Sequence, residues 1–267
     1  MIKLTKHTYY LLILTLFFVS CEGDEDVTNL LDPGGGDYDP PETTIVSGPD
    51  NITLTTDDLT YTFTGNELVT EFSYRLDVGT MIGNWSDWST EASVTFTNLD
   101  EGSHTFNVKG RYSDVDEDGS PATATFTVDA VTGPSILFYP RSPSVPINSV
   151  FSVDIVAEEV DGVSGIEIEI EYEDDYLTLQ GDLIQGSVLT DEIVVEEVSS
   201  ESIRVTIGIT AGADGENLIG TETLFSLQFT SIQTGTSEIS FNTVQYRDEN
   251  NNIIEIHQTI NSIVTVQ

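Results

Sequence analysis

The sequence predicts an all-β protein made of two consecutive β-sandwiches. After about residue 41, apolar and polar residues alternate with period two in one short segment after another. Turn-forming pairs such as Gly65-Asn66 and Asp118-Gly119 separate these segments, and no stretch shows the spacing of an amphipathic helix. A chain of 267 residues also has room for about two domains.

Residues 1–20 have the features of an export signal. Lys3 and Lys6 precede the apolar run YYLLILTLFFV, which is too short to cross a bilayer because crossing takes about 20 apolar residues. The segment FVSC, which ends at Cys21, resembles a bacterial lipobox. We therefore expect signal cleavage before Cys21 and lipidation of its sulfur. The alternative is an ordinary cleaved signal with an incidental thiol, although a single leftover cysteine is unusual in an exported chain.

Residues 21–42 are expected to form an acidic tether. Four acids occur between residues 22 and 26, and the stretch NLLDPGGGDYDPPE that follows is rich in Gly, Pro and Asp without periodicity. The acidic start resembles the tract that directs some Gram-negative lipoproteins to the outer face of the outer membrane; otherwise it only begins a linker. We expect the exported chain to be lipid-anchored in the outer membrane and to face the cell exterior.

The chain is strongly negative, and this charge limits the kinds of partner that can bind it. It has 46 acids against eight bases, a net charge of −38, and two of the bases lie in the leader. Such a surface repels the phosphates of nucleic acids and of anionic membranes, so a nucleic-acid partner is not expected. Without a specific partner, the same acids would serve as a solvated coat that keeps the protein soluble.

Residues 43–130 are predicted to form the first sandwich. Alternating apolar residues mark five strands, at residues 59–65, 71–77, 93–99, 104–110 and 122–128. The segments PETTIVSGP, FSYRLD and NLDEGSHTFNVKG resemble bacterial immunoglobulin-like and fibronectin-III-like modules. This resemblance implies their sandwich fold and no particular function. It also gives His104 the place of a corner tyrosine, so we interpret His104 as a structural residue.

The segment WSDWS at residues 85–89 has the letters of a box found in cytokine receptors. In that family the box lies near the last strand, beside a ladder of arginines. Here it lies in the middle of the module, after the strand predicted at residues 71–77, and three basic residues are available: Arg75, Lys109 and Arg111. We interpret the match as accidental and expect Trp85 and Trp88 to cap one end of the core. The other interpretation is a platform that stacks sugars, because paired tryptophans are typical of such sites.

The segment DVDEDGS offers a candidate calcium site. Asp114, Asp116 and Asp118 with Gly119 reproduce the first half of a calcium-binding loop. The twelfth position is Thr125 instead of glutamate, and no helical pattern follows. Two interpretations stay open: a weak surface calcium site, and the acidic tip of a hairpin. No other cofactor is expected.

Residues 134–267 are predicted to form the second sandwich, a jelly roll of about nine strands. The segments FSVDIVA, GIEIEIEYEDDYLTLQG, SIRVTIGIT, LFSLQFTSIQTGTSEISF and SIVTV follow one another in the order and spacing that resemble the cohesin family. One departure is Glu173-Asp174-Asp175, where many members have Asp-Pro after the tyrosine. This departure leaves the fold intact and bears on which partner binds.

The cohesin resemblance implies a receptor for dockerin modules, which other proteins carry and which bring their own calcium. In cohesins the dockerin lies across one sheet, whose strands correspond here to residues 165–173 and 202–210. Because isoleucines and valines on these strands must face the core, the outward residues form the predicted partner-binding face: Glu167, Glu169, Glu171, Arg204 and Thr206. The alternative is an acidic ladder on a solvated face.

The predicted function is a cell-surface lipoprotein that anchors dockerin-bearing, polysaccharide-degrading enzymes or other secreted proteins. Two other functions stay open, a glycan-binding surface lipoprotein of a polysaccharide-utilisation system and a structural adhesin, because fold alone does not separate them. An enzyme is not expected. The exported part has two histidines, His104 and His257, in different sandwiches, and no nucleophile or phosphate-binding motif.

Overall fold

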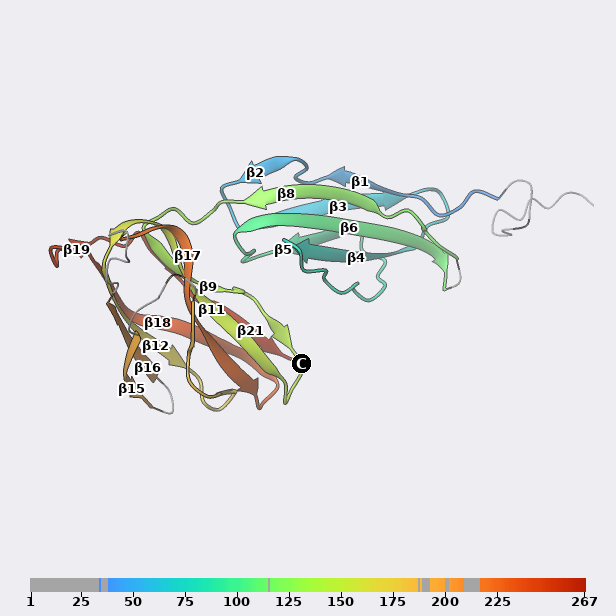
Figure 1. Cartoon of the computed structure of the whole chain (residues 1–267). Coiled ribbons are helices and arrows are strands. Elements are labelled where there is room, and N and C mark those ends of the chain that lie inside the picture. The colour runs from blue at the N-terminus through green and yellow to red at the C-terminus, as the bar shows by residue number, and fades with distance from the viewer. Residues whose placement is uncertain are drawn as a thin grey trace, which may run out of the picture. The chain divides into compact units, whose positions relative to one another are not determined.

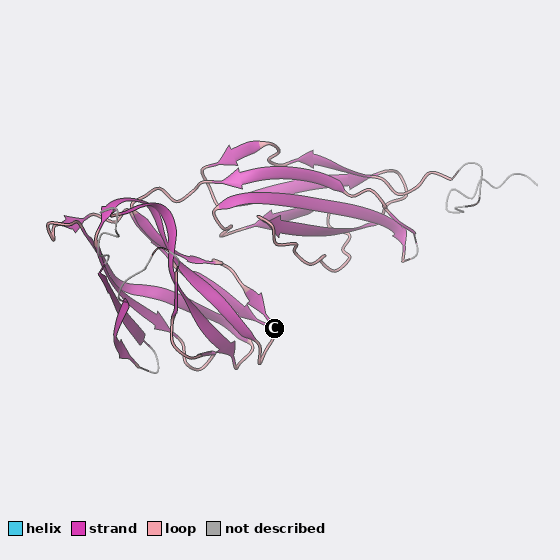
Figure 2. Cartoon of the chain, in the orientation of Figure 1, coloured by secondary structure: helices cyan, strands magenta, loops and turns pink. Residues whose placement is uncertain are grey.

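The computed structural model is all-β (Figure 1), as predicted. It describes residue 34 and residues 38–114, 116–186, 188, 193–199, 202–208 and 217–267. Every regular element in this part of the chain is a strand (Figure 2). Among the described residues, no helix has the length and apolar character needed to cross a membrane.

The first sandwich consists of two sheets. One has the strand order β1 (Thr43–Ser47), β3 (Leu59–Gly65) and β5 (Ser93–Phe96). The other has the order β2 (Ile52–Leu54), β8 (Ala122–Val128), β6 (Gly102–Ser113) and β4 (Glu71–Val78), with β7 (Asp116–Glu117) paired to β6. The five predicted strands correspond to β3, β4, β5, β6 and β8.

Aromatic residues fill the space between these two sheets. Tyr61 and Phe63 of β3 are buried, as their alternation with threonine predicts. Tyr61 stacks on Phe106 of β6 with 4.0 Å between ring centroids and 7° between ring planes. Such an aromatic pair stabilises a core by about 0.5–1.5 kcal/mol beyond the burial of its area.

His104 belongs to this core. Its side chain is 2% exposed, and its ring stacks on Phe126 with 5.1 Å between centroids. Nδ1 lies 3.0 Å from the carbonyl oxygen of Gly102, and Nε2 is buried without a hydrogen-bond partner in the described part of the chain. A neutral ring that donates from Nδ1 fits these surroundings, and burial lowers the pKa of His104. The interpretation of His104 as a structural residue agrees with this environment.

The second sandwich also has two sheets. The larger has the order β10 (Ser144–Val145), β21 (Ser262–Val266), β18 (Gly235–Arg247), β12 (Gly165–Tyr172), β16 (Ser202–Gly208) and β15 (Ile193–Val198), with β19 (Ile253–Ile254) on β18. The smaller has the order β13 (Leu177–Leu179), β17 (Leu218–Ser231), β11 (Val150–Val163), β9 (Ser135–Tyr139) and β20 (Gln258–Ile260), with β14 (Ile184–Gln185) on β17. Short segments such as β10, β14 and β19 divide the chain more finely than the nine predicted strands.

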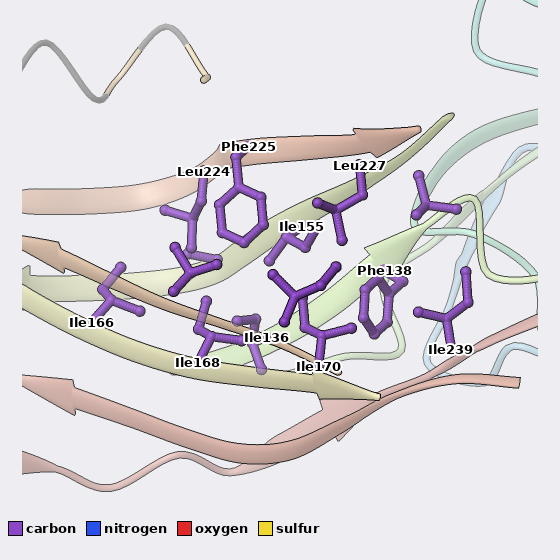
Figure 3. Packing of buried hydrophobic residues seen from close by; sticks show 14 of the residues in the cluster. Ile136, Phe138, Ile155, Ile166, Ile168, Ile170, Leu224, Phe225, Leu227 and Ile239 are labelled. Atoms are coloured by element: carbon purple, nitrogen blue, oxygen red, sulfur yellow. The ribbon is translucent and has the colours of Figure 1, made fainter. Parts of the chain in front are cut away.

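The core between these sheets fixes the orientation of β12. Ile166, Ile168 and Ile170 of β12 are at most 2% exposed. In Figure 3 they point toward Phe225 and Leu227 of β17, from the opposite sheet. Burying each isoleucine stabilises the fold by about 1.5–3 kcal/mol, so a one-residue slip of β12 would be strongly disfavoured.

The two sandwiches have separate apolar cores, which share no residue. Arg141, just after β9, is 5% exposed; its side chain donates hydrogen bonds to the Leu99 carbonyl oxygen at 2.8 Å and to the Asp57 carboxylate at 2.6 Å. Arg141 therefore joins residues of the two sandwiches by polar contacts. Separate folding of residues 43–130 and 134–267 stays a prediction.

Candidate functional site

The predicted partner-binding face lies on the outer side of the seven-stranded sheet. β12 runs antiparallel between β16 and β18, and the register pairs Glu167 with Thr206 and Glu169 with Arg204. Glu167 and Glu171 are exposed, and the other three predicted residues are partly exposed. The structure therefore brings all five together on one face, while the alternate residues of the same strands fill the core.

The charge on this face is compensated only in part. Glu169 forms an ion pair with Arg204 at 3.3 Å and accepts a hydrogen bond from Nδ2 of Asn242 at 3.2 Å. Within the described residues, Glu167 and Glu171 have no ion pair. Outward carboxylates two residues apart on a strand lie about 7 Å from each other and repel by about 0.6 kcal/mol in water before salt screening. A basic surface that docked here would relieve this repulsion.

The structure corrects the prediction for Trp85 and Trp88. Neither ring belongs to the buried core; both are partly exposed beside β4 and β6. The Arg75 guanidinium lies 4.9 Å from the Trp85 ring centroid, and that of Arg111 lies 4.4 Å from the Trp88 centroid. Nζ of Lys109 lies 4.9 and 5.2 Å from the two centroids. We call this alternating row, in the order Arg75, Trp85, Lys109, Trp88, Arg111, the tryptophan ladder.

Acidic residues hold the cations of the tryptophan ladder in place. Arg75 pairs with Asp77 at 2.9 Å, and Lys109 pairs with Glu117. Arg111 pairs with Glu71 and with Asp114, each at 2.8 Å. A cation over an aromatic ring stabilises by about 0.5–2 kcal/mol, depending on how dry the contact is, so the row acts as a structural element.

The tryptophan segment, residues 85–89, also pairs with the edge of β4 through its backbone. The backbone N–H of Ser86 donates to Tyr74 at 2.8 Å, and that of Ser89 donates to Phe72 at 2.9 Å. The segment thus covers the edge of β4, which would otherwise present unpaired backbone groups. Because Lys109 lies close to both rings, it occupies space that a stacked sugar would need. The sugar-platform interpretation therefore gains no support.

The candidate calcium residues do not come together as a cation site. Asp114 pairs with Arg111, and Asp118 is 3% exposed, with its Oδ1 accepting a hydrogen bond from the backbone N–H of Ser120 at 2.8 Å. In the described ranges, no group of three or more acidic or histidine side chains is placed to hold a metal ion. This arrangement agrees with the acidic hairpin tip, between β6 and β7. Calcium binding by Asp116 and its neighbours stays a prediction.

Cys21 and the export signal lie outside the described residues, so lipidation stays a prediction. His257 is exposed, and its backbone N–H donates to the carbonyl oxygen of Pro134 at 2.7 Å. His104 is buried in the other sandwich, so the two histidines do not form a common site.

This chain is similar to known proteins in its three-dimensional structure. Neither a scan against protein-family models nor a search of curated proteins finds a match. Several solved structures are similar to about half of this chain. Three of them are described below.

The first is a non-cellulosomal cohesin from the archaeon Archaeoglobus fulgidus, with 21% identity and a TM-score of 0.42, covering 50% of this chain and 90% of that one. The second is a type I cohesin–dockerin complex, Coh-OlpA with Doc918, from Clostridium thermocellum, with 16% identity, a TM-score of 0.44 and coverages of 50% and 99%. The third is CaCohA2 from Clostridium acetobutylicum, with 19% identity, a TM-score of 0.44 and coverages of 50% and 91%. At these values the matches assign no partner to this chain.

Proposed function

We propose that this chain is a cell-surface lipoprotein whose second sandwich binds a partner protein through the outer face of β12 and β16. The observation that carries the proposal is the placement of five polar side chains on two paired strands whose inward isoleucines and valines are buried. Side chains on such strands are presented rigidly, so less order is lost on binding. Glu167 and Glu171 would steer and orient a basic partner surface.

The class of partner follows from the cohesin resemblance of residues 134–267. We propose a dockerin-bearing secreted protein, with a polysaccharide-degrading enzyme as its commonest carrier. In chain order, a lipid on Cys21, an acidic tether, a spacer sandwich and a receptor sandwich follow one another. This order suits a receptor that must reach partners outside the membrane. The outer face of the outer membrane is the proposed location.

A pull-down from the cell's secreted proteins tests the receptor proposal. The bait is the exported chain with Cys21→Ser, which avoids the lipid. The face variant Glu167→Lys with Thr206→Arg changes the net charge of the face by +3. The control variant Glu222→Lys with Thr178→Arg adds the same charge to the six-stranded sheet, through residues on β17 and β13.

The wild-type bait and the control variant should capture the same protein, and the face variant should capture at least about tenfold less, as expected when like charges are placed opposite a basic partner. Equal capture by all three baits would move the site to another face. If the wild-type bait captures nothing specific, the receptor proposal is wrong.

Anchoring is tested separately. Cys21→Ser should move the exported chain from the detergent phase to the aqueous phase, because acyl chains supply the membrane affinity. Folding should be unchanged, since Cys21 precedes both sandwiches. A Cys21→Ser chain that still partitions into detergent would contradict lipid anchoring.

A further inference from the structure

A cavity of about 580 Å³ lies at the end of β12, beside the partner-binding face. This volume is within the range of about 300–1,000 Å³ that is typical of ligand sites. The register places Ser240, Glu171 and Ser202 in one row across β18, β12 and β16, and all three line the cavity. Residues 173–176, between β12 and β13, form another part of the lining.

Two tyrosines give the cavity a fixed apolar part. Tyr172 is 7% exposed, and its hydroxyl lies 3.5 Å from the Ser199 carbonyl oxygen. The Tyr176 ring packs directly on Gly235, where an added Cβ would lie 2.8 Å from Cε1 of the ring. The backbone of Tyr176 is held as well, because its N–H donates to Glu173 and its carbonyl oxygen accepts from Ile232. The wall is therefore already formed in the free protein.

The charge of the cavity has one sign. Five carboxylates line it: Glu171, Glu173, Asp174, Asp175 and Glu238. No lysine, arginine or histidine is among its described lining residues, and none of the five takes part in an ion pair found in the described part of the chain. Two residues before Glu171 on β12, by contrast, Glu169 is neutralised by Arg204. The cavity is thus complementary to a cationic group.

The lining also indicates which kind of cation fits. In the described ranges no group of three acidic or histidine side chains is close enough to hold a bare metal ion. A long cationic side chain uses more of this cavity, because its methylene stem packs on tyrosine and its head reaches carboxylate and serine oxygens. Arginine fits best, since its planar guanidinium binds carboxylates with two parallel hydrogen bonds and stacks on aromatic rings.

We propose that this cavity binds an arginine or lysine side chain of a partner protein that docks on the adjacent face. The inference rests on the proposed function only for the source of that side chain. Its position at the end of the sheet would fix the orientation of the partner along β12. Glu171 belongs to both the face and the cavity, so it links the two contacts.

The proposal is tested with peptides, so that no partner need be known. The exported chain with Cys21→Ser, labelled with nitrogen-15, is titrated with blocked tetra-arginine, tetralysine and tetraglutamine. The cavity variant is Glu173→Gln, Asp174→Asn, Asp175→Asn. The control variant is Asp161→Asn, Glu249→Gln, Glu255→Gln, which removes three exposed carboxylates that do not line the cavity.

Tetra-arginine should shift the amide signals of Ser199, Ser202 and Ser240, and its affinity should fall about tenfold in the cavity variant and less than about twofold in the control, as for a specific charge-assisted contact. Tetraglutamine should cause no shifts. Equal weakening in both variants would mean that binding follows net charge only and would overturn the proposal.

Absence of tetra-arginine binding would also overturn it, as would calcium chloride shifting these amides when the peptides do not. The two proposals fail separately. A pull-down that succeeds while the peptides do not bind would remove the cavity and leave the receptor face in place. Peptide binding with no captured partner would support the cavity and remove the receptor face.

Discussion

Two sheet faces of this chain carry outward acidic residues, and their charges are balanced differently. On the first sandwich, Glu71 and Asp77 of β4 pair with arginines of the tryptophan ladder. On the second sandwich, Glu167 and Glu171 of β12 have no ion pair within the described residues. The number of acids is similar, so the difference lies in where the few basic residues are placed.

Six basic residues follow the leader, and three of them stand in the tryptophan ladder: Arg75, Lys109 and Arg111. Their placement makes the outer face of β4 and β6 self-complementary, which suits a structural surface. The face of β12 keeps an excess of negative charge, which suits recognition of a basic partner. The comparison therefore favours a structural role for the first face and agrees with the binding role proposed for the second.

The largest expected effect comes from Ile168→Ala, which empties part of the second core. Ile168 is fully buried, so the variant should lose about 2–5 kcal/mol of unfolding free energy. Both tryptophans lie in the first sandwich, so tryptophan fluorescence reports that sandwich alone while circular dichroism reports both. In urea, the dichroism transition should move and the fluorescence transition should stay. Both transitions moving together would show that the sandwiches unfold as one unit.

A smaller effect is expected in the tryptophan ladder. Lys109→Met keeps the side-chain stem and removes the cation between the two rings, so it should cost about 1–2 kcal/mol. The matched variant on the second face is Arg204→Met, which breaks a partly exposed ion pair and should cost about 0.2–1 kcal/mol. Denaturant curves of both variants measure the difference. Equal losses would remove the distinction between the two faces.

Acid should weaken the first sandwich through His104. Burial lowers the folded-state pKa of His104, while the Gly102 carbonyl and the Asp100 carboxylate oppose this shift in part. Below about pH 6.5 the unfolded chain therefore binds more protons at this residue, and stability falls as the pH falls. Each unit by which the folded-state pKa lies below the unfolded-state pKa corresponds to about 1.4 kcal/mol of unfolding free energy that is lost in acid.

The measurement compares wild type with His104→Gln, which keeps a hydrogen-bond donor and does not titrate. Fluorescence-detected unfolding between about pH 7.5 and pH 5 brackets the ordinary histidine pKa. The stability advantage of wild type should shrink as the pH falls. Asp100, Glu101 and Glu158 have raised pKa values and act in the opposite direction, but both proteins contain them. An advantage that grows on acidification would contradict this assignment.

The smallest effect on stability is expected from the face variant Glu167→Lys with Thr206→Arg. Both positions lie on the outer side of a sheet whose core is unchanged, so the unfolding free energy should stay within about 0.5 kcal/mol of wild type. Thermal unfolding measures it. A loss of several kcal/mol would mean that these side chains are structural, as in the tryptophan ladder.

Periodicity was sufficient to predict the longer strands, such as β3, β12 and β16, and the direction of their side chains, because it is a local property. The alternation around Ile168 predicts both the buried stripe and the outward glutamates. The ladder needed the register between β4 and β6, which places Lys109 opposite Ser73 and thus near both tryptophans. The cavity forms where three segments that are far apart in the sequence meet, around residues 171–176, residues 199 and 202, and residues 238 and 240. Neither arrangement can be deduced from spacing along one segment.

The most direct test of the account is carboxylate footprinting of the exported chain, alone and with the protein that the pull-down captures. A carbodiimide label reports the accessibility of each acid on both sandwiches in one experiment. The account predicts that Glu167 and Glu171 lose reactivity in the complex, while Glu71 and Asp77 react as before. Protection of Glu71 and Asp77 with unchanged reactivity at Glu167 and Glu171 would contradict it.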